Sequence, residues 1–414
     1  MKLFNVSILT VQYGGCNPLV RIIITSDLHI DASYTYLTGQ KLDERRSDFL
    51  TSLDAILEIT GQQKADVLLI AGDFFDKVNP SNEARFHAMR SLKNFTKMTK
   101  TKIFIVSGNH DAPKSSSSSR TPLDTLGLLD NVVVETSGDE FKHYRTSGSG
   151  KSIGIYMKGY DGLHGNANPL SSLPKGSDDI NIALLHGSLN LAKSCYSDYK
   201  DYAPFNADDC NGKGFDCFAL GHLHEPQHYA TEHGIFMYPG CPQRYSFKEA
   251  DGKKGVYLLD TDKVLDEDTI QFLPIPCREL AITEVKLDKS MDDLNQVILD
   301  AIKNDDQNAL LNILLTGTVL FDAYKKLKIS ELIGELNEYW FAVKVDKEFQ
   351  VYDPYSEFEF KDLSAIGPKE EFKKAISKKL AVAKKEKNEV LVEKYKWMLD
   401  VGMKMLTKIQ EGGE

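Results

Sequence analysis

The run Val20-Arg-Ile-Ile-Ile-Thr-Ser-Asp-Leu-His29 decides how this chain folds, because a short apolar strand ends directly in a carboxylate and an imidazole. The arrangement recurs at four further places, where an apolar run of strand length ends in a polar motif. The five motifs are Asp27-Leu-His29, Gly72-Asp73, Gly108-Asn109-His110-Asp111, His186-Gly187 and Gly221-His222-Leu223-His224. Such runs predict strands buried on both faces of a sheet. Since α/β folds carry ligand sites at the carboxyl ends of their strands, we expect the motifs to gather at one edge.

The side chains of these motifs predict a site for divalent cations. Carboxylate and imidazole donors suit Mn²⁺, Fe²⁺ or Zn²⁺ better than Ca²⁺, and the absence of thiolates from the motifs argues against a structural zinc site. Each motif alone has an ordinary explanation, because Gly-Asp is a common turn dipeptide and Gly-Asn-His-Asp can form an Asx-turn. Five of the ten histidines fall within the motifs, however, and we interpret the whole set as a two-metal phosphoesterase site.

The order and wording of the motifs resemble the calcineurin-like metallophosphoesterases. Within them the chain resembles the SbcD-type nuclease subunit, the counterpart of the eukaryotic meiotic-recombination nuclease of double-strand-break repair. The segment Tyr238-Pro-Gly-Cys-Pro-Gln-Arg-Tyr-Ser-Phe-Lys-Glu249 is similar to the one that closes the nuclease domain in this family, and general phosphatases usually lack it. The resemblance implies an α/β fold: a two-sheet sandwich flanked by helices, with a small α+β capping domain and a C-terminal helical pair.

The resemblance also implies two metal sites that share one carboxylate. The expected ligands of the first cation are Asp27, His29, Asp73 and His224. Those of the second are Asp73, Asn109, His186 and His222. A bridging carboxylate holds two cations roughly 3.5–4 Å apart, which suits attack on phosphorus by a metal-bridging hydroxide. We expect the two cations to be Mn²⁺.

His110 and Asp111 are the expected catalytic residues. His110 follows Asn109 directly, so it can protonate the departing 3′ oxygen or stabilise its charge. Asp111 either orients His110 or caps the next helix. At Asp76, archaeal and eukaryotic relatives carry a histidine, and an aspartate there resembles the bacterial members. We expect this aspartate to leave the metal site unchanged, while the loss of a cationic side chain beside the scissile phosphate leaves strand and end preference open.

Composition bounds the class of protein. A chain of 414 residues with 42% hydrophobic content can build two or three domains with a sizeable core. Six cysteines without C-x-x-C spacing fit a reducing compartment. The N-terminus carries too little basic charge for a signal peptide, and no run approaches the length of a membrane span. We therefore expect a cytoplasmic protein that has no membrane association.

The net charge of −10 excludes DNA binding by counterion release over the whole surface. A grip on DNA must then come from local basic residues or from a partner. The candidates for such a local patch are Lys114, Arg120, Lys142, His143 and Arg145. Taken alone, the charge slightly favours a phosphatase, but the segment that ends at Glu249 outweighs it.

The chain divides into five expected regions. They are an N-terminal extension at 1–19, the nuclease domain at 20–278, an α+β capping domain at 279–350, a linker at 351–367 and a helical partner-binding tail at 368–414. The cap reads as β-α-β-α-β and either holds duplex DNA near the metals or serves as a structural lid. The apolar face of the tail comprises Leu391, Tyr395, Trp397, Met398, Val401 and Met405. This face either folds back on the cap or, as the resemblance implies, docks on the coiled-coil base of an SbcC-type ATPase.

We interpret the chain as a Mn²⁺-dependent DNA exonuclease and endonuclease of double-strand-break repair and recombination. The partners implied by the resemblance are DNA, the SbcC-type ATPase and a second copy of the chain. A phosphomonoesterase or cyclic-nucleotide phosphodiesterase of the same fold is the first alternative. A non-catalytic scaffold is an alternative of another class, although such proteins usually lose several ligands. A small-molecule phosphatase would need neither the cap nor the helical tail.

Overall fold

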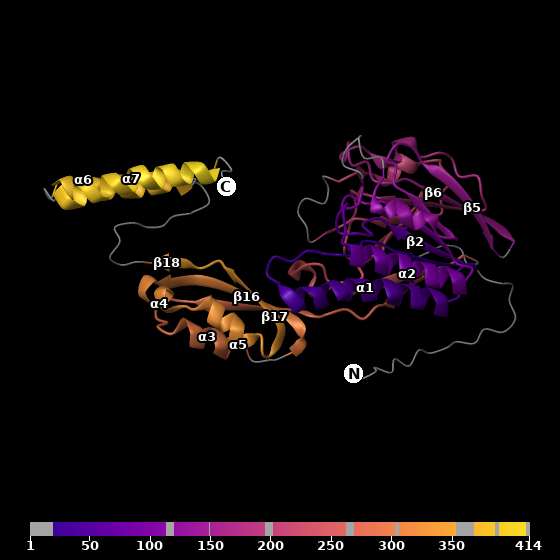
Figure 1. Cartoon of the computed structure of the whole chain (residues 1–414). Coiled ribbons are helices and arrows are strands. Elements are labelled where there is room, and N and C mark those ends of the chain that lie inside the picture. The colour runs from indigo at the N-terminus through magenta and orange to yellow at the C-terminus, as the bar shows by residue number, and fades with distance from the viewer. Residues whose placement is uncertain are drawn as a thin grey trace. The chain divides into compact units, whose positions relative to one another are not determined.

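The computed structural model of the chain describes residues 20–112, 120–148, 150–194, 202–261, 269–302, 306–352, 368–385 and 389–410 (Figure 1). The expected N-terminal extension, Lys114 and most of the expected linker lie outside these residues. The chain forms two compact units. The first comprises Met1–Glu284, Ile302–Leu314 and Ile329–Asp346, and the second comprises Val285–Ala301, Leu315–Lys328 and Lys347–Glu414. The five-region division stays a prediction.

Two six-stranded sheets form the larger part of the first unit. The first sheet has the order β14 (Ile270–Pro274), β13 (Gly255–Asp260), β1 (Arg21–Thr25), β2 (Val67–Ala71), β3 (Lys102–Val106), β4 (Val132–Glu135). The second has the order β11 (Gln227–Thr231), β12 (Gly234–Tyr238), β10 (Cys217–Gly221), β7 (Ile180–His186), β6 (Lys151–Met157), β5 (Lys142–Gly148). The central strands run parallel, as their fully apolar sequences predict.

The sheets lie face to face over one apolar core. Alternate residues of β1, such as Ile22 and Ile24, pack with Ile182 and Leu184 of β7 between the sheets. The opposite side of β1 presents Ile23 to the helices α1 (Gly39–Gln62) and α2 (Asn82–Met98), which lie side by side in Figure 1. A third cluster covers the outer face of the second sheet. The expected two-sheet sandwich flanked by helices is therefore confirmed.

Strand register brings the polar motifs to a common edge. Gly221 at the end of β10 pairs with His186 at the end of β7, and Ala71 at the end of β2 pairs with Val106 of β3. Beyond the strands, Ile30 forms a parallel bridge with Phe75. Each loop that carries a motif therefore leaves its sheet at the same end as the others. The short connecting elements are η1 (Pro122–Leu128), η2 (Pro169–Ser172), β8 (Ser188–Leu189), β9 (Pro204–Phe205), η4 (Ala207–Cys210) and η5 (Phe247–Glu249).

A separate sheet follows the two six-stranded sheets along the chain, in the order β15-β16-β17, with β18 paired to β16. Its strands and the helices between them are β15 (Leu280–Leu287), α3 (Leu294–Ala301), β16 (Asp306–Leu320), α4 (Phe321–Lys326), α5 (Ile329–Leu336), β17 (Trp340–Lys347) and β18 (Gln350–Tyr352). The structure contains the expected β-α-β-α-β pattern, and β16 is twice as long as the strand expected at 309–315.

Two helices end the described chain, α6 (Pro368–Lys385) and α7 (Glu389–Gln410), as the sequence predicts. They pack on each other, with Ile376 and Ala383 buried and Phe372 against Gly402. Within the described residues, no helix is long and apolar enough to span a membrane.

Candidate metal centre

Backbone turns at the strand ends aim the ligand side chains inward. Four of the expected ligands have a positive φ, at 52° for Asp27, 44° for His29, 45° for Asp73 and 96° for His222. Aspartate and histidine tolerate this left-handed region better than most residues. Gly108 is needed beside them, because a Cβ there would collide with the Asp73 carboxylate. The ligand positions are thus set largely by the backbone.

The first half of the site, which we call the carboxylate-supported half, contains His29 and His224. The Nδ1 atom of His29 lies 3.1 Å from Oδ1 of Asp76, and the Nδ1 atom of His224 lies 2.9 Å from Oε1 of Glu249. Because a carboxylate only accepts, each Nδ1 donates a proton and each neutral ring keeps a lone pair on Nε2. The two Nε2 atoms lie 3.1 Å apart.

Two lone pairs that face each other at this distance repel unless a proton or a metal ion lies between them, so these donors can accommodate a metal ion. Asp27 completes the group, since one ligand atom from each of Asp27, His29 and His224 lies within 4.8 Å of the others. All three side chains are buried. A carboxylate that holds the far nitrogen of a metal-ligating histidine fixes its tautomer and makes it a stronger ligand.

The second half, which we call the amide-supported half, contains His186, Asn109 and His222. The Nδ1 atom of His186 donates to the carbonyl oxygen of Ala71 at 3.0 Å, so its Nε2 is an acceptor. That Nε2 lies 2.9 Å from Oδ1 of Asn109, another acceptor, which also lies 3.1 Å from Nδ1 of His222. Acceptors directed at one another again fit a cation.

Asp73 lies between the halves. Its Oδ2 atom is 3.7 Å from Nε2 of His29 and 3.5 Å from Nε2 of His186, while its Oδ1 accepts from the backbone amide of His110 at 2.9 Å. Burial would raise the pKa of Asp73, but the nearby His186, His110 and His29 outweigh it and hold the pKa below its usual range. Asp73 is therefore an ionised carboxylate in the position of a bridging ligand.

The structure brings all seven expected ligands to this one edge. It also brings the expected catalytic residues His110 and Asp111 to this edge. Asp111, which we expected to orient His110 or to cap a helix, bonds to backbone amides instead. Asp111 accepts from the backbone amides of Gly108, at 2.8 Å, and Phe75, at 3.1 Å, so its carboxylate ties two loops together. Burial and the charge of Asp73 raise the pKa of Asp111 to about 8.

His110 is oriented by Asp76. Its Nδ1 donates to the carbonyl oxygen of Asp76 at 2.9 Å and lies 3.6 Å from the carboxylate oxygen Oδ1 of the same residue. The side chain of His110 is 34% exposed, so part of the ring is accessible to solvent. The same carboxylate contacts His29, an expected ligand, and that an aspartate here leaves the metal site unchanged stays a prediction.

Sequence reasoning missed the side chains that support the ligands. Glu249 contacts His224 and forms a buried ion pair with Lys254, with 2.5 Å between Oε2 and Nζ. Burial would raise the pKa of Glu249, but His224 and Lys254 outweigh it and hold the pKa below its usual range. Tyr245 donates its hydroxyl to Asp76 at 2.9 Å. The signal was present in part, because Tyr245 and Glu249 lie in the segment that carries the family resemblance.

Three members of the expected basic patch pair with carboxylates. Lys142 pairs with Glu135 at 2.9 Å, and both His143 and Arg145 contact the carboxylate of Asp178. Arg120 is exposed.

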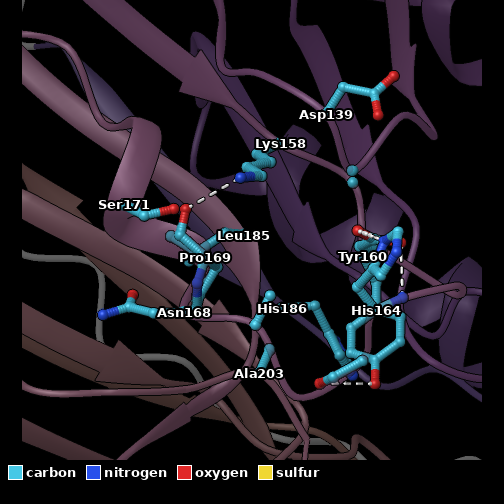
Figure 2. A pocket seen from close by; sticks show the side chains of 15 residues that line it. Asp139, Lys158, Tyr160, His164, Asn168, Pro169, Ser171, Leu185, His186 and Ala203 are labelled. Atoms are coloured by element: carbon cyan, nitrogen blue, oxygen red, sulfur yellow. Dashed lines mark hydrogen bonds and ion pairs between the residues drawn. The ribbon is translucent and has the colours of Figure 1, made fainter.

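A cavity of about 270 Å³ borders His186 (Figure 2). On its wall, the ammonium group of Lys158 bonds to the carbonyl oxygen of Pro169, at 3.2 Å, and to the hydroxyl of Ser172, at 3.0 Å. Of the seven expected ligands, His186 is among the residues that line this cavity, although its side chain is itself buried.

The chain is similar in sequence to known metallophosphoesterases. The family model described as calcineurin-like phosphoesterase matches residues 20–226. The uncharacterised metallophosphoesterase YhaO of Bacillus subtilis is 27% identical over 242 residues, which cover 57% of this chain and 56% of that protein. The chain thus spans little more than half the length of this relative.

Two further relatives carry nuclease and repair names. A component of the nuclease SbcCD of Staphylococcus epidermidis is 25% identical over 360 residues, covering 80% of this chain and 90% of that protein. The DNA double-strand break repair protein Mre11 of Archaeoglobus fulgidus is 24% identical over 356 residues, covering 78% and 76%. Both matches cover more of this chain than the match to YhaO does.

Proposed function

Because this chain belongs to the calcineurin-like phosphoesterase family, we propose that it is a two-metal DNA nuclease acting in double-strand-break repair. One observation carries the proposal. The segment Tyr238–Glu249, which resembles the SbcD-type nucleases, supplies Glu249 to His224 and the Tyr245 hydroxyl to Asp76. The part of the sequence that separates these nucleases from general phosphatases is therefore built into the metal centre. The long matches to the Staphylococcus and Archaeoglobus proteins support the same assignment.

The cations fit the seven ligands, and when bound they would lower the pKa of a water molecule and offset the charge that develops on phosphorus. We propose Mn²⁺ for both positions, in keeping with the mixed carboxylate, imidazole and amide donors. Asp73 would serve both cations. Asp27, His29 and His224 would hold one of them, and Asn109, His186 and His222 the other.

The protein's own acid would be His110. Its Nδ1 is committed to the backbone carbonyl of Asp76, so the Nε2 proton is the one it can give to the departing 3′ oxygen. Burial would lower the pKa of His110, but the charges of Asp73 and Asp76 outweigh it and raise the pKa above its usual value. A raised pKa favours the protonated ring, which is the form that a general acid requires. Asp111 would act indirectly, by fixing the loop that carries His110.

A nuclease assay tests the proposal. Linear duplex and hairpin DNA would be incubated with the protein and Mn²⁺, with and without an SbcC-type ATPase. We expect basal cleavage of the linear DNA, and stimulation with hairpin opening when the ATPase and ATP are present. Hydrolysis of a cyclic nucleotide or a phosphomonoester without cleavage of DNA would favour the phosphatase alternative. Metal binding without any hydrolysis would favour the scaffold.

We further propose that α6 and α7 dock on the coiled-coil base of an SbcC-type ATPase. The two helices bury part of their apolar surface against each other, yet the Trp397 side chain stays 65% exposed. A large exposed aromatic residue within an apolar face is typical of a protein contact site. A cytoplasmic location is part of the same proposal, and the free thiols of Cys210, Cys217 and Cys241 support a reducing compartment.

Deletion of residues 365–414 tests the docking role. The shortened protein should keep its metal sites and basal Mn²⁺-dependent cleavage, and should lose co-purification with the ATPase. Met398→Glu should act in the same way, because burying an unpaired carboxylate at an interface costs several kcal/mol. Pull-down of the ATPase by the shortened protein would refute docking. A much earlier melting transition would instead favour helices that fold back on the cap.

A further inference from the structure

Arg45 is a fully buried guanidinium in the middle of α1, with 0% of its surface exposed. Arginine is almost never buried to this degree unless its charge is paired. One terminal nitrogen, NH1, donates to Oδ2 of Asp48 at 2.9 Å and to Oε1 of Gln243 at 3.2 Å. The other, NH2, donates to the carbonyl oxygen of Arg244 at 2.5 Å. The guanidinium of Arg45 thus joins α1 to residues almost two hundred positions further along the chain.

Arg45 reaches Gln243 and Arg244, and Tyr245 is the next residue along the chain. We call Gln243–Tyr245 the anchored segment. Gln243 donates its side-chain amide to the hydroxyl of Ser52 on the same helix at 2.9 Å. The carbonyl oxygen of Tyr245 accepts from the hydroxyl of Tyr34 at 3.1 Å. All three residues of the anchored segment are therefore held by side chains from residues 34–52.

The anchored segment ends in the residue that touches both supporting carboxylates. The Tyr245 hydroxyl donates to Oδ1 of Asp76 at 2.9 Å, and its backbone amide donates to Oε2 of Glu249 at 3.2 Å. The Tyr245 ring also lies against both metal-facing imidazoles, with centroid distances of 4.5 Å to His29 and 5.4 Å to His224. A shift of this one residue would move both carboxylates and both rings.

We propose that Arg45 is a positioning residue for the carboxylate-supported half of the metal centre. It fixes the anchored segment, so that Tyr245 sets Asp76 and Glu249, which in turn orient His29 and His224. Arginine suits the task because its planar fork reaches three acceptors at once, whereas a lysine ammonium is a single point charge. The inference rests on the proposed two-metal site and is independent of the DNA substrate.

Asp48 extends the same network to residues that follow the nuclease sheets. Its Oδ2 atom, which accepts from Arg45, also accepts from Nε of Arg278 at 2.6 Å, and its Oδ1 accepts from NH2 of Arg278 at 3.0 Å. The guanidinium of Arg278 lies 3.7 Å from the ring centroid of Phe341. Arg278→Gln should therefore disturb Arg45 through Asp48, with a smaller effect than a change at Arg45 itself.

Metal titration of the full-length protein tests the inference without any substrate. Mn²⁺ binding would be measured by calorimetry for Arg45→Met, Arg45→Lys and Tyr245→Phe. We expect each to weaken one of two cations about tenfold to a hundredfold, as changes to residues behind metal ligands do, and to leave the other unchanged. In the metal-free protein, the histidine ¹⁵N spectra of the same variants should show that His29 and His224 lose their single tautomer.

Arg21→Met is the matched control. Arg21 also holds α1, through a 2.9 Å bond from NH1 to the carbonyl oxygen of Gln63, but it lies at the start of β1, away from the motif edge. This variant should bind both cations as the wild type does, even with a lower melting temperature. Should Arg45→Met fail to fold, Arg45→Lys and Tyr245→Phe still decide the matter.

Wild-type affinity for both cations in Arg45→Lys and Tyr245→Phe would overturn the positioning role, as would a wild-type protein that binds fewer than two. A wild-type protein that binds two cations but leaves DNA intact would refute only the nuclease proposal.

Discussion

The two halves of the metal centre hold their histidines in different ways. In the carboxylate-supported half, both rings are fixed by carboxylates, those of the half-buried Asp76 and the buried Glu249, and the donors are buried. In the amide-supported half, His186 is held by a backbone carbonyl, while Asn109 and His222 are only partly buried. A negative charge behind a ligand strengthens its bond to a cation, and a neutral group does so less. We therefore propose that the first half retains its cation more firmly and that the second half faces the substrate.

Replacing Asp73, the proposed bridging carboxylate, should weaken cation binding in both halves of the metal centre. Asp73→Ala removes the one side chain that both cations would share, so both should be weakened and Mn²⁺-dependent cleavage should fall more than a hundredfold. Calorimetry and a cleavage assay on the same preparation measure the two effects. Cleavage above about a hundredth of the wild-type rate would show that the halves do not depend on a common bridge.

His110 should separate chemistry from metal binding. Replacing it by alanine removes the proposed acid, and such losses cost about a hundredfold or more in rate. Neither half loses a ligand, so the variant should still bind two cations. The rate comes from single-turnover cleavage and the stoichiometry from metal titration. If a cation were lost as well, His110 would belong among the ligands.

Glu249→Gln should affect one half only. The change removes the charge behind His224, so the affinity for one cation should fall about tenfold to a hundredfold. It also leaves Lys254 buried without its ion pair, which lowers stability for a separate reason. The double variant with Lys254→Met removes that second effect and serves as the control. Equal weakening of both cations would remove the distinction between the halves.

The smallest effect should come from Asp76→Asn, seen in the pH profile at saturating Mn²⁺. His110 must be protonated to act as an acid, so activity falls as the pH rises through its pKa. The charges of Asp73 and Asp76 raise that pKa, and the amide removes one of them while keeping the backbone bond. The descending limb should therefore move to lower pH, by less than about one unit. An unmoved limb would mean that another group titrates there.

The proposed ligands could be predicted from the sequence because their signal is local. Each motif follows an apolar strand within a few residues. Because parallel strands end at the same edge of a sheet, the motifs come together there. Asp76 and Glu249 carried no such signal, because their roles depend on which side chains the fold brings against them. The same limit explains the basic residues on β5. Lys142 and Arg145 look free in the sequence, and only the structure shows Glu135 and Asp178 beside them.

Two features of the fold were partly foreseen. The helical pair follows from the periodicity of its apolar residues and from Pro368, which suits a first helical turn. The length of β16, Asp306–Leu320, was underestimated. Its polar and glycine positions, including Gly317 with a φ of 97°, interrupt the apolar run that was used to place the strand. Hydrogen bonding to the neighbouring strands keeps these positions extended, and that pairing cannot be read from a local sequence pattern.

The left-handed backbone at Asp27, His29, Asp73 and His222 has a consequence for how fast a cation enters the site. These conformations are set by the loops themselves and are held by main-chain hydrogen bonds such as the one from Asp27 to Gly72. The ligand side chains are therefore already positioned before a cation binds, and binding needs little rearrangement of the chain. The rate of loading should then follow the ease with which each ion sheds its water. Mg²⁺, which gives up water reluctantly, should enter more slowly than Mn²⁺.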